Sequence, residues 1–455
     1  MFRPVKQNSM RIFQTNKKIY ILLALFFVAS LSYSFYYRIK PVVDASAYDR
    51  VGYNLSRGCG YVESNQNCGH PERDDAIGRV GPGYQFFLAG VYFVFGHKIW
   101  IVWFFHALFR AITAFVIYKI ALFVFEENTQ KEKIGILAAI FFGFMPDLIV
   151  YNAMLLIETL FLLLFSLAIY FLLRSYDSTN SKTILLASFF LSFGIMTRPT
   201  PFLVLAVAFL IFLFTKKIKF AFLLLLFPIL LIAPWAYRNF QLHERIILTS
   251  TTGGYDLWVG NNPEATGGFD KTDEIAQYRR VNGLVLADKK GWEEYFKFIR
   301  EEPLKFIDLQ YDKAAIYFSA LRPTGFWAYL GTWGQVMTLG ASFLATFFLF
   351  GFGLSGFFSM GEDLINSTRK RFFVLFGALQ PLAVIPVIVE TRYRAAFFIF
   401  LAISAAYMMV KLIFNRANRG RVYRMLSWSF GILFLIIFWD AVNNIILIKE
   451  KLINF

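Results

Sequence analysis

Apolar runs of about 20 residues recur along nearly the whole chain, beginning with "IYILLALFFVASLSYSFYY" at residues 19–37. A run of this length is what a helix needs to cross a hydrocarbon core about 30 Å thick. Lipid offers the backbone no hydrogen-bonding partners, so a spanning segment of this kind is expected to be helical. Only 17% of the residues are charged, whereas a soluble domain carries about 25%. The sequence therefore predicts an all-α polytopic membrane protein.

The net charge of +16 alone would suggest a nucleic-acid partner. The basic residues, however, form short clusters between the apolar runs, where the positive-inside rule places them. We interpret the basic clusters as determinants of membrane topology and expect no nucleic acid among the partners. Lys17 and Lys18 precede the first run, which lacks a small-residue cleavage site, so we expect a retained anchor with a cytoplasmic N-terminus.

The apolar run at residues 83–97 is shorter than a comfortable crossing. If it crosses, the basic loop 416–424 lies outside the cytoplasm. If it lies at the outer interface as a juxtamembrane helix, then 216–219, 369–371 and 416–424 all become cytoplasmic, which the positive-inside rule favours. We therefore prefer the juxtamembrane position.

This topology gives eleven crossings and an outer C-terminus, with spans at 19–38, 99–125, 133–151, 155–174, 183–196, 200–215, 219–236, 334–358, 371–389, 393–412 and 425–448. It divides the chain into a catalytic transmembrane module (1–236, with the first outer loop at 39–98), a cap loop (237–333) and C-terminal helices (334–455). The cap loop holds 12 Lys/Arg and 13 Asp/Glu, so we expect a small, near-neutral cap of mixed secondary structure. Its stretch "WEEYFKFIREEPLKFI" predicts an interfacial amphipathic helix.

Polar features converge on the outer side in this topology. They are the loop with Asp44, the turn at Glu158, "TRPT" at 197–200, the cap loop, and "ETRYR" at 390–394. The chain's two cysteines, Cys59 and Cys68, also lie in the first outer loop. In an oxidising compartment they would pair; two free thiols are the alternative.

Two acids stand out. Asp44 follows Pro41 near the end of the first helix, where partial desolvation would raise its basicity and suit it to take a proton or hold a metal. The alternative is an N-cap for a helix at 45–56. Glu158 lies in "AMLLIETLFLLLF", where an acid is costly unless it faces a partner or a wet cavity. The alternative is a helix-start residue in the headgroup region.

Three arginines suit a phosphate or pyrophosphate, whose charge matches planar, forked donors: Arg198, Arg392 and Arg394. For Arg198 the alternative is a snorkelling arginine at the membrane interface. The segment with Trp258, Asn261 and Asn262 is a candidate platform for a sugar or an isoprenoid head, against the alternative of a plain polar loop.

An ordered set of motifs resembles bacterial glycosyltransferases of the GT-C superfamily, closest to the protein O-mannosyltransferase-like (dolichyl-phosphate-mannose-protein mannosyltransferase) family and more distantly to the aminoarabinose transferases. The motifs are "DASAYDRVGYNLSRGCGYV" (44–62), "RVGPGYQFFLAGVYFVFG" (79–96), "ETLF" (158–161), "GIMTRPT" (194–200), "PWAYRNF" (234–240), "GGYDLWVGNNPEATG" (253–267) and "RYR" (392–394). No one motif is decisive, but their order covers most of the chain.

The resemblance implies a GT-C helix bundle with outer juxtamembrane helices and a cap. It implies an inverting transfer from a polyprenyl-phosphate sugar to a glycan, lipid or protein hydroxyl at the exoplasmic face of the plasma or inner membrane. Asp44 would be the catalytic base and Glu158 a second acid. The expected substrate contacts are Tyr48, Asp49, Arg79, Arg198, Arg238, Trp258, Asn261, Asn262, Arg392 and Arg394.

Two departures from the family pattern leave a divalent metal cofactor open: Ala45 stands where some members have a second acid, and "GPG" (81–83) where they have Lys-Pro-Pro. The sugar and the acceptor are not identified by the sequence. A transporter or flippase of a lipid-linked saccharide is the rival interpretation. It would place ionisable residues deep in mid-helix.

Overall fold

The computed structural model describes residues 17–178, 180–269, 271–321, 332–362, 367–415, 419–443 and 445. Every regular element in these ranges is helical, as predicted. The first half contains α1 (Lys17–Tyr37), α2 (Asp44–Ser56), η3 (Asp75–Gly78), α3 (Gly83–Phe95), α4 (Ile99–Val124), α5 (Lys131–Gly143), α6 (Pro146–Ala153), α7 (Glu158–Asp177), α8 (Ser181–Thr197), α9 (Pro201–Phe214) and α10 (Ile218–His243). The second contains α11 (Gly253–Gly260), α12 (Asp273–Glu301), α13 (Pro303–Phe318), α14 (Thr332–Gly361), α15 (Thr368–Val384), η5 (Thr391–Arg394), α16 (Ala395–Phe414) and α17 (Arg419–Asn443).

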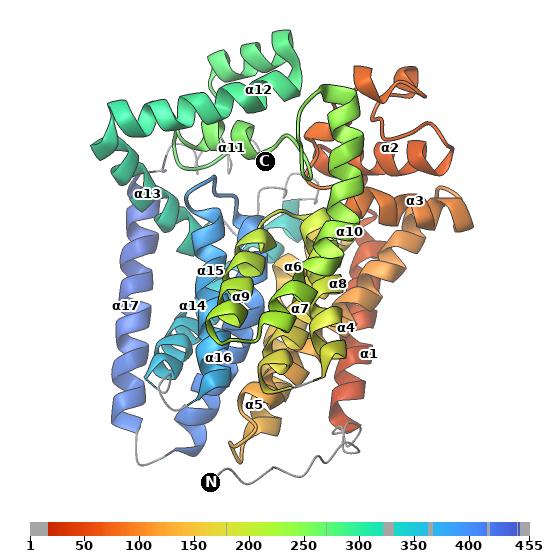
Figure 1. Cartoon of the computed structure of the whole chain (residues 1–455). Coiled ribbons are helices and arrows are strands. Elements are labelled where there is room, and N and C mark those ends of the chain that lie inside the picture. Colours follow the sequence, from red (N-terminus) through yellow and green to blue (C-terminus); the bar gives the residue numbers. More distant parts are fainter. Residues whose placement is uncertain are drawn as a thin grey trace.

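The apolar helices form one bundle, and the remaining helices lie over one end of it (Figure 1). Within the described residues, seven candidate spans are long and apolar enough to cross a membrane; they correspond to α1, α4, α7, α10, α14, α16 and α17. An eighth results if α5 and α6, which are bent by 50°, count as one span. The helices α8, α9 and α15 have 17, 14 and 17 residues. The total of eleven crossings therefore stays a prediction.

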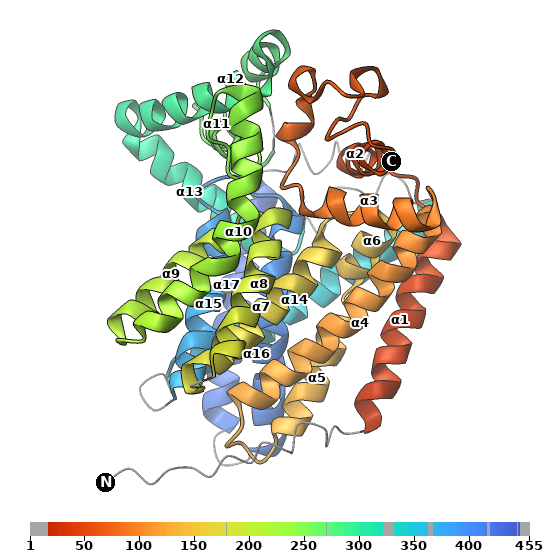
Figure 2. The ribbon, with the colours of Figure 1, turned by 45° about the vertical axis from the view of Figure 1, so that its right-hand side comes forward.

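Helix α3 lies across the end of the bundle rather than along it (Figure 2), which agrees with the juxtamembrane position predicted for 83–97. The chain turns sharply into α4 at Gly96, whose φ of 74° lies in the left-handed region that glycine adopts without steric cost. The segment 39–82 packs above α3 and contains a disulfide between Cys59 and Cys68.

Basic residues gather at the opposite end of the bundle. Arg369, at the start of α15, pairs with Asp177 at 2.6 Å and also with Glu126, which follows α4. Lys217, just before α10, donates to the Tyr176 carbonyl near the end of α7. Two of the three clusters that the positive-inside rule assigned to one side, 216–219 and 369–371, therefore share one end of the bundle. Residues 416–418 of the third cluster lie outside the described residues. Which side of the membrane that end faces stays a prediction.

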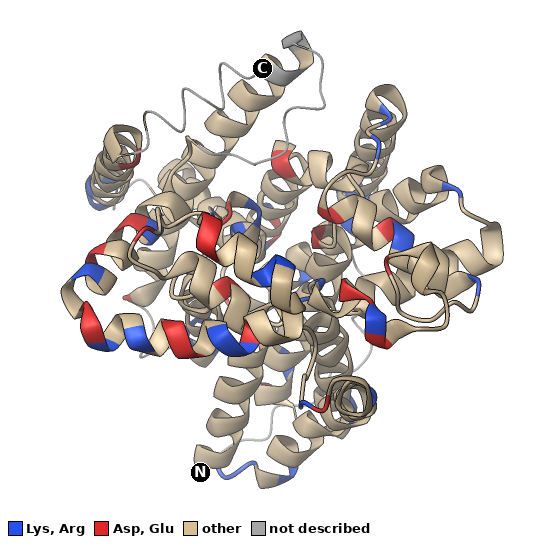
Figure 3. Cartoon of the chain, turned by 90° about the horizontal axis from the view of Figure 1, so that it is seen from above, with Lys and Arg blue, Asp and Glu red and all other residues tan. Residues whose placement is uncertain are grey.

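The cap differs from expectation in three ways. Its described part consists of helices and turns without a strand, so it is not of mixed secondary structure. Helix α10 continues to His243, so the predicted boundary at 237 falls inside a helix. The stretch predicted as one amphipathic helix is divided by Pro303, which begins α13 because proline fits the first turn of a helix better than its interior. Seen from above, acidic and basic residues alternate over the cap (Figure 3).

Candidate functional site

Titratable side chains from widely separated segments meet where the cap covers the bundle. We call this group the polar cluster. Its members are Asp44, Tyr48, Arg79, Glu158, Arg198, Asp256, Lys271, Arg392 and Tyr393. Six of the nine were predicted as site residues from the sequence.

Asp44 is held between two arginines. Its Oδ2 accepts a hydrogen bond from Nη2 of Arg392 at 2.5 Å, and its Oδ1 lies 3.7 Å from Nη1 of Arg79. Burial raises the pKa of Asp44, but the neighbouring charges of Arg392 and Arg79 lower it more, so the net pKa lies below its usual value. Arg79 also donates to Oε2 of Glu63 from Nε (2.9 Å) and Nη2 (2.7 Å). Asp44 is therefore ionised near neutral pH and neutralised by its partners.

The backbone before Asp44 is strained. Val43 precedes α2 with φ at 49°, a left-handed conformation that is a genuine outlier for a β-branched residue and costs of order 1–3 kcal/mol. Val43, rather than Asp44, occupies the N-cap position, and no side chain caps this helix. The alternative interpretation of Asp44 as an N-cap is therefore wrong. Leu155, shortly before Glu158, has a similar φ of 53°.

A second ion pair lies beside the first. Oε1 of Glu158 is 3.6 Å from Nη1 of Arg198, and both side chains are almost fully buried. Among the described residues, neither carboxylate oxygen of Glu158 has a hydrogen-bond partner. The Arg198 guanidinium lies 4.4 Å from the ring centroid of Tyr393, and that of Arg392 lies 5.4 Å from the same centroid. Tyr393 thus lies close to two of the three arginines that were predicted to bind phosphate.

Two glycines support Arg198. Helix α8 ends at Thr197, and Arg198 has extended backbone angles, as expected before Pro199. The "GPG" turn packs against this end of α8. A Cβ on Gly81 would lie 2.2 Å from the Met196 carbonyl oxygen, and one on Gly83 would lie 2.8 Å from Oγ1 of Thr197. Gly81 also has a φ of 42°. These glycines allow the close approach that sets the position of Arg198.

Three members of the cluster were missed from the sequence: Tyr393, and two that come from the cap. Asp256 lies in the first turn of α11, and Lys271 precedes α12. Burial and the charge of Asp44 raise the pKa of Asp256 to about 7. Burial lowers the pKa of Lys271, as does Arg279. Both residues stand in a polar loop region, where no local pattern distinguishes them from solvated charges.

Six predicted contacts lie outside the cluster, and three of them are Asp49, Arg394 and Arg238. Asp49 accepts a hydrogen bond from the Tyr92 hydroxyl, and its Oδ1 lies 2.9 Å from Nε2 of His97, so it joins α2 to the end of α3. Arg394 is fully buried and donates to the carbonyls of Tyr317 and Ser319. Arg238 stacks near the Trp235 ring, with 4.9 Å to its centroid. In this structure these residues have structural partners.

The predicted sugar platform lies inside the cap. Trp258 packs edge-on against Tyr278. Asn261 donates to the carbonyls of Leu257, Pro386 and Val387 and accepts from Lys313. Asn262 bonds to backbone groups of its own turn. The three residues also line a cavity of about 270 Å³ at α11 and α12, so their substrate role stays a prediction.

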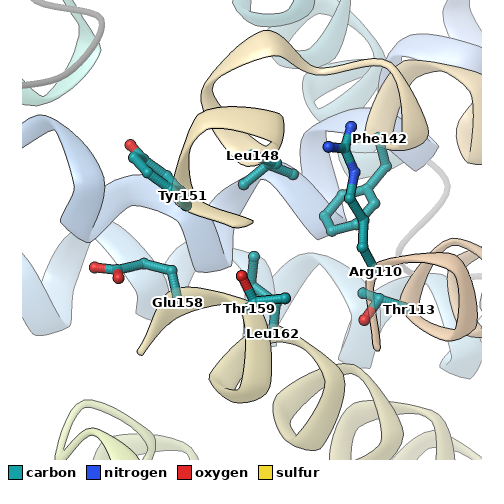
Figure 4. A pocket seen from close by; sticks show the side chains of 8 residues that line it. All are labelled: Arg110, Thr113, Phe142, Leu148, Tyr151, Glu158, Thr159 and Leu162. Carbon is teal, nitrogen blue, oxygen red and sulfur yellow. The ribbon is translucent and has the colours of Figure 1, made fainter. Parts of the chain in front are cut away.

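A small cavity of about 10 Å³ adjoins the Glu158 end of the cluster. Figure 4 shows Glu158 and Tyr151 at one end of it and Arg110 at the other. This volume approaches that of a single ordered water, for which polar walls are required. The Tyr151 hydroxyl and both Glu158 oxygens form no hydrogen bond with a described residue, so the cavity offers such walls.

The donor set of the cluster does not fit a divalent cation. Both Asp44 oxygens face arginines, and Glu158 faces Arg198, so positive charge already occupies the positions a metal would need. The described residues contain no group of three or more His, Cys, Asp or Glu placed to hold a metal ion.

Fold and site together define a polytopic helical membrane protein with an arginine-rich polar cluster beneath a cap. The family model for dolichyl-phosphate-mannose-protein mannosyltransferase matches residues 79–237. The structure is similar to the oligosaccharyltransferase of Archaeoglobus fulgidus, solved with Zn and sulfate, with a TM-score of 0.52, 12% identity and coverage of 92% of this chain and 53% of that one. This chain thus spans about half the length of that protein.

ArnT from Cupriavidus metallidurans, solved with undecaprenyl phosphate, matches with a TM-score of 0.41 at 11% identity, over 85% of this chain and 77% of that chain. No matching relative was found among curated proteins. The family match and the fold of the oligosaccharyltransferase confirm the resemblance to the GT-C superfamily.

Proposed function

We propose that this protein is an inverting membrane glycosyltransferase that moves a sugar from a polyprenyl-phosphate donor to an acceptor hydroxyl at the exoplasmic face. The observation that carries the proposal is the convergence of Asp44, Arg79, Glu158, Arg198 and Arg392 where the cap meets the bundle. Buried or half-buried guanidinium groups beside carboxylates suit a reaction that needs an anion held and a proton removed.

In the proposed reaction the negatively charged donor phosphate forms ion pairs with the guanidinium groups of Arg392, Arg198 and Arg79. Arg392 and Arg79 then no longer neutralise Asp44, whose carboxylate becomes able to accept the hydroxyl proton of the acceptor. The acceptor oxygen forms a bond to the anomeric carbon as the bond from that carbon to the phosphate oxygen breaks. The arginines stabilise the charge that develops on the leaving lipid phosphate. Since attack and departure occur on opposite faces, the configuration inverts.

Buried ionisable residues inside the bundle would favour the flippase alternative. Arg110 is the clearest case, but it donates to Ser30 Oγ and to the carbonyls of Gly143 and Met145. It therefore satisfies backbone groups at the end of α5. This partner set favours a packing role for Arg110 over a transport path.

The test is incubation of the purified protein with a panel of polyprenyl-phosphate sugars and measurement of released lipid phosphate. We expect release with at least one donor, and loss of release in Asp44→Asn. Asp273→Asn, an exposed aspartate at the start of α12, is the matched control and should behave as wild type. No release from any donor, together with movement of a labelled lipid-linked saccharide across vesicles, would contradict the proposal.

A further inference from the structure

Helix α4 presents three hydrogen-bond donors on one face. They are Trp103, His106 and Arg110, and their spacing of three and four residues places them along one side of a helix. All three side chains are buried, and each contacts backbone carbonyl groups of the bent pair α5 and α6. We call these three residues the donor row. Because a carbonyl group without a donor is costly in a membrane, the donor row explains how the chain can bend by 50° between α5 and α6.

The first two members of the donor row hold the end of α6. Nε1 of Trp103 donates to the Ala153 carbonyl at 3.1 Å. Nδ1 of His106 lies 3.1 Å from the Asn152 carbonyl oxygen. That oxygen can only accept, so Nδ1 carries a proton, and in the neutral ring Nε2 accepts from the Tyr84 hydroxyl, 3.1 Å away. The last carbonyls of a helix have no partner within it, and here the two side chains take the place of the missing amides.

Helix α1 holds the same point from another side. Nδ2 of Asn152 donates to Oγ of Ser34 at 3.2 Å, and Oγ of Ser34 donates to the Ser30 carbonyl at 3.0 Å. Asn152 and both serines are fully buried. The backbone and the side chain of Asn152 are therefore fixed by two different helices.

The segment held in this way leads directly to Glu158. Residues 154–157 alone separate the end of α6 from Glu158, which begins α7, and all of them are buried. Leu155 has a φ of 53°, a left-handed conformation that persists only where the surrounding structure enforces it. No described side chain caps α7 at Ile157. The position of Glu158 therefore depends on the segment that precedes it.

Glu158 in turn faces Arg198. Oε1 of Glu158 lies 3.6 Å from Nη1 of Arg198, and both side chains are almost fully buried. Within the described residues no hydrogen bond fixes either Glu158 oxygen, so the backbones set the distance between the two charges. A buried pair is screened little by water and ions. Movement at the end of α6 should therefore change how firmly Arg198 is held.

We propose, resting on the glycosyl transfer described above, that Trp103 and His106 are positioning residues for the donor phosphate. They hold the end of α6, the end of α6 fixes Glu158, and Glu158 fixes the Arg198 guanidinium that pairs with the phosphate. Neither Trp103 nor His106 touches the donor. The effect of both residues is transmitted through the Glu158 carboxylate.

His106→Phe keeps a ring and removes the donor to the Asn152 carbonyl. We expect the KM of the lipid-linked donor to rise about 10-fold, which corresponds to about 1.4 kcal/mol of binding free energy. The change in kcat should be smaller, because binding shared by the ground state and the transition state is lost in KM. His106→Asn places an amide nitrogen at the position of Nδ1 and should restore most of the KM. Tyr118→Phe, which removes a bond from α4 to Glu132 of α5, is the matched control and should keep the wild-type KM.

A double-variant cycle tests the route through Glu158. If His106 acts through Glu158, the KM of the double variant His106→Phe, Glu158→Gln should equal that of Glu158→Gln alone. Trp103→Phe, which removes the indole donor to Ala153, should give the same result. Effects on KM that multiply would show that the residues act separately, and would overturn the inference.

A second readout does not depend on turnover. Amide hydrogen exchange of the detergent-solubilised protein should be faster at 152–161 in His106→Phe than in wild type, because local opening controls exchange. It should be unchanged there in Tyr118→Phe. Equal exchange in all three proteins, or an increase spread over the whole bundle, would overturn the inference whatever the activity.

The two proposals fail in different ways. A wild-type protein that releases no lipid phosphate but shows the expected exchange would overturn the proposed function, and would leave the attachment of the Glu158 segment to α4 established. An active protein whose donor KM is unchanged by His106→Phe would overturn the inference alone.

Discussion

Arg392 and Asp44 lie 348 residues apart in the chain, and their side chains form a hydrogen-bonded ion pair with 2.5 Å between Nη2 and Oδ2. The pair joins the start of α2 to η5, the segment before α16. It closes the polar cluster and neutralises the carboxylate that the resemblance assigns as base. The same ion pair therefore holds two distant segments together and neutralises the proposed catalytic base.

Arg392→Gln should remove both the partner of Asp44 and a donor for the phosphate. We expect release of lipid phosphate to fall by about 100-fold, because truncating one member of a close, buried charge pair commonly costs 2–5 kcal/mol. The control is Arg300→Gln, an exposed arginine in the last turn of α12. Equal rates for both variants would show that Arg392 does not touch the donor.

The stability lost in Asp44→Asn should depend on pH. A carboxyl whose folded pKa is lowered contributes stability above its unfolded pKa of about 3.9 and loses that contribution as pH falls through the folded pKa. We expect Asp44→Asn to be less stable than wild type at pH 6 and the difference to shrink toward pH 3. Thermal unfolding in detergent, followed by tryptophan fluorescence, measures it. A gap that stays constant over this range would contradict the ion pair.

Gly81→Ala should displace Arg198. The new Cβ would lie 2.2 Å from the Met196 carbonyl oxygen at a backbone φ of 42°, so α8 must shift at its end, at a cost of about 1–3 kcal/mol. We expect lower stability and slower transfer. Gly90→Ala is the matched control, since nothing lies within 4 Å of a Cβ there. It should preserve or raise stability. Equal stability and equal transfer rates in the two variants would contradict the claim that Gly81 sets the position of Arg198.

Asn261→Ala separates a structural role from a substrate contact. The change removes one acceptor of Lys313 and one donor to each of the carbonyls of Pro386 and Val387, which keep their bonds to Lys313. We expect the free energy of unfolding to fall by about 1–3 kcal/mol, because hydrogen bonds to buried groups, one of them charged, are lost. Asn282→Ala, which loses one exposed bond to the Tyr278 carbonyl, should change little. Unaltered stability with weaker donor binding would instead favour the substrate role.

The membrane orientation can be read from single cysteines. Lys98→Cys, between α3 and α4, should react with an impermeant maleimide from outside the cell, and Lys219→Cys, in the first turn of α10, only after the cytoplasm is opened. The native cysteines are joined in a disulfide and give no background. Reaction at position 98 from the cytoplasm would overturn the crossing order.

Much of the architecture followed from local pattern. The boundaries of α1, α4 and α7 lie within three residues of the predicted spans, because hydrocarbon thickness sets the length of an apolar run. Other bounds depended on contacts between segments. Helix α10 extends beyond its apolar run into the cap. Its last residues contact protein rather than lipid, so the length of the apolar run does not set the end of this helix.

Some residues of the site could likewise be identified from local sequence, and others could not. Asp44, Glu158, Arg198 and Arg392 were identifiable because charge beside apolar sequence is costly and must be satisfied somewhere. Asp256 was not, since an acid in a polar loop carries no such signal. Conversely, Asn261 and Arg394 were chosen for their residue type, and the structure gives them partners within the protein.

The sequence by itself determined that this chain is a helical membrane protein with its polar residues gathered toward one end, since the energetics of lipid act on each segment separately. Only the tertiary structure decided which of those residues meet. That outcome depends on how α2, α8, α11 and η5 pack, and on contacts as close as those at Gly81 and Gly260. Distances across the chain arise from all of these contacts together, and no single segment encodes them.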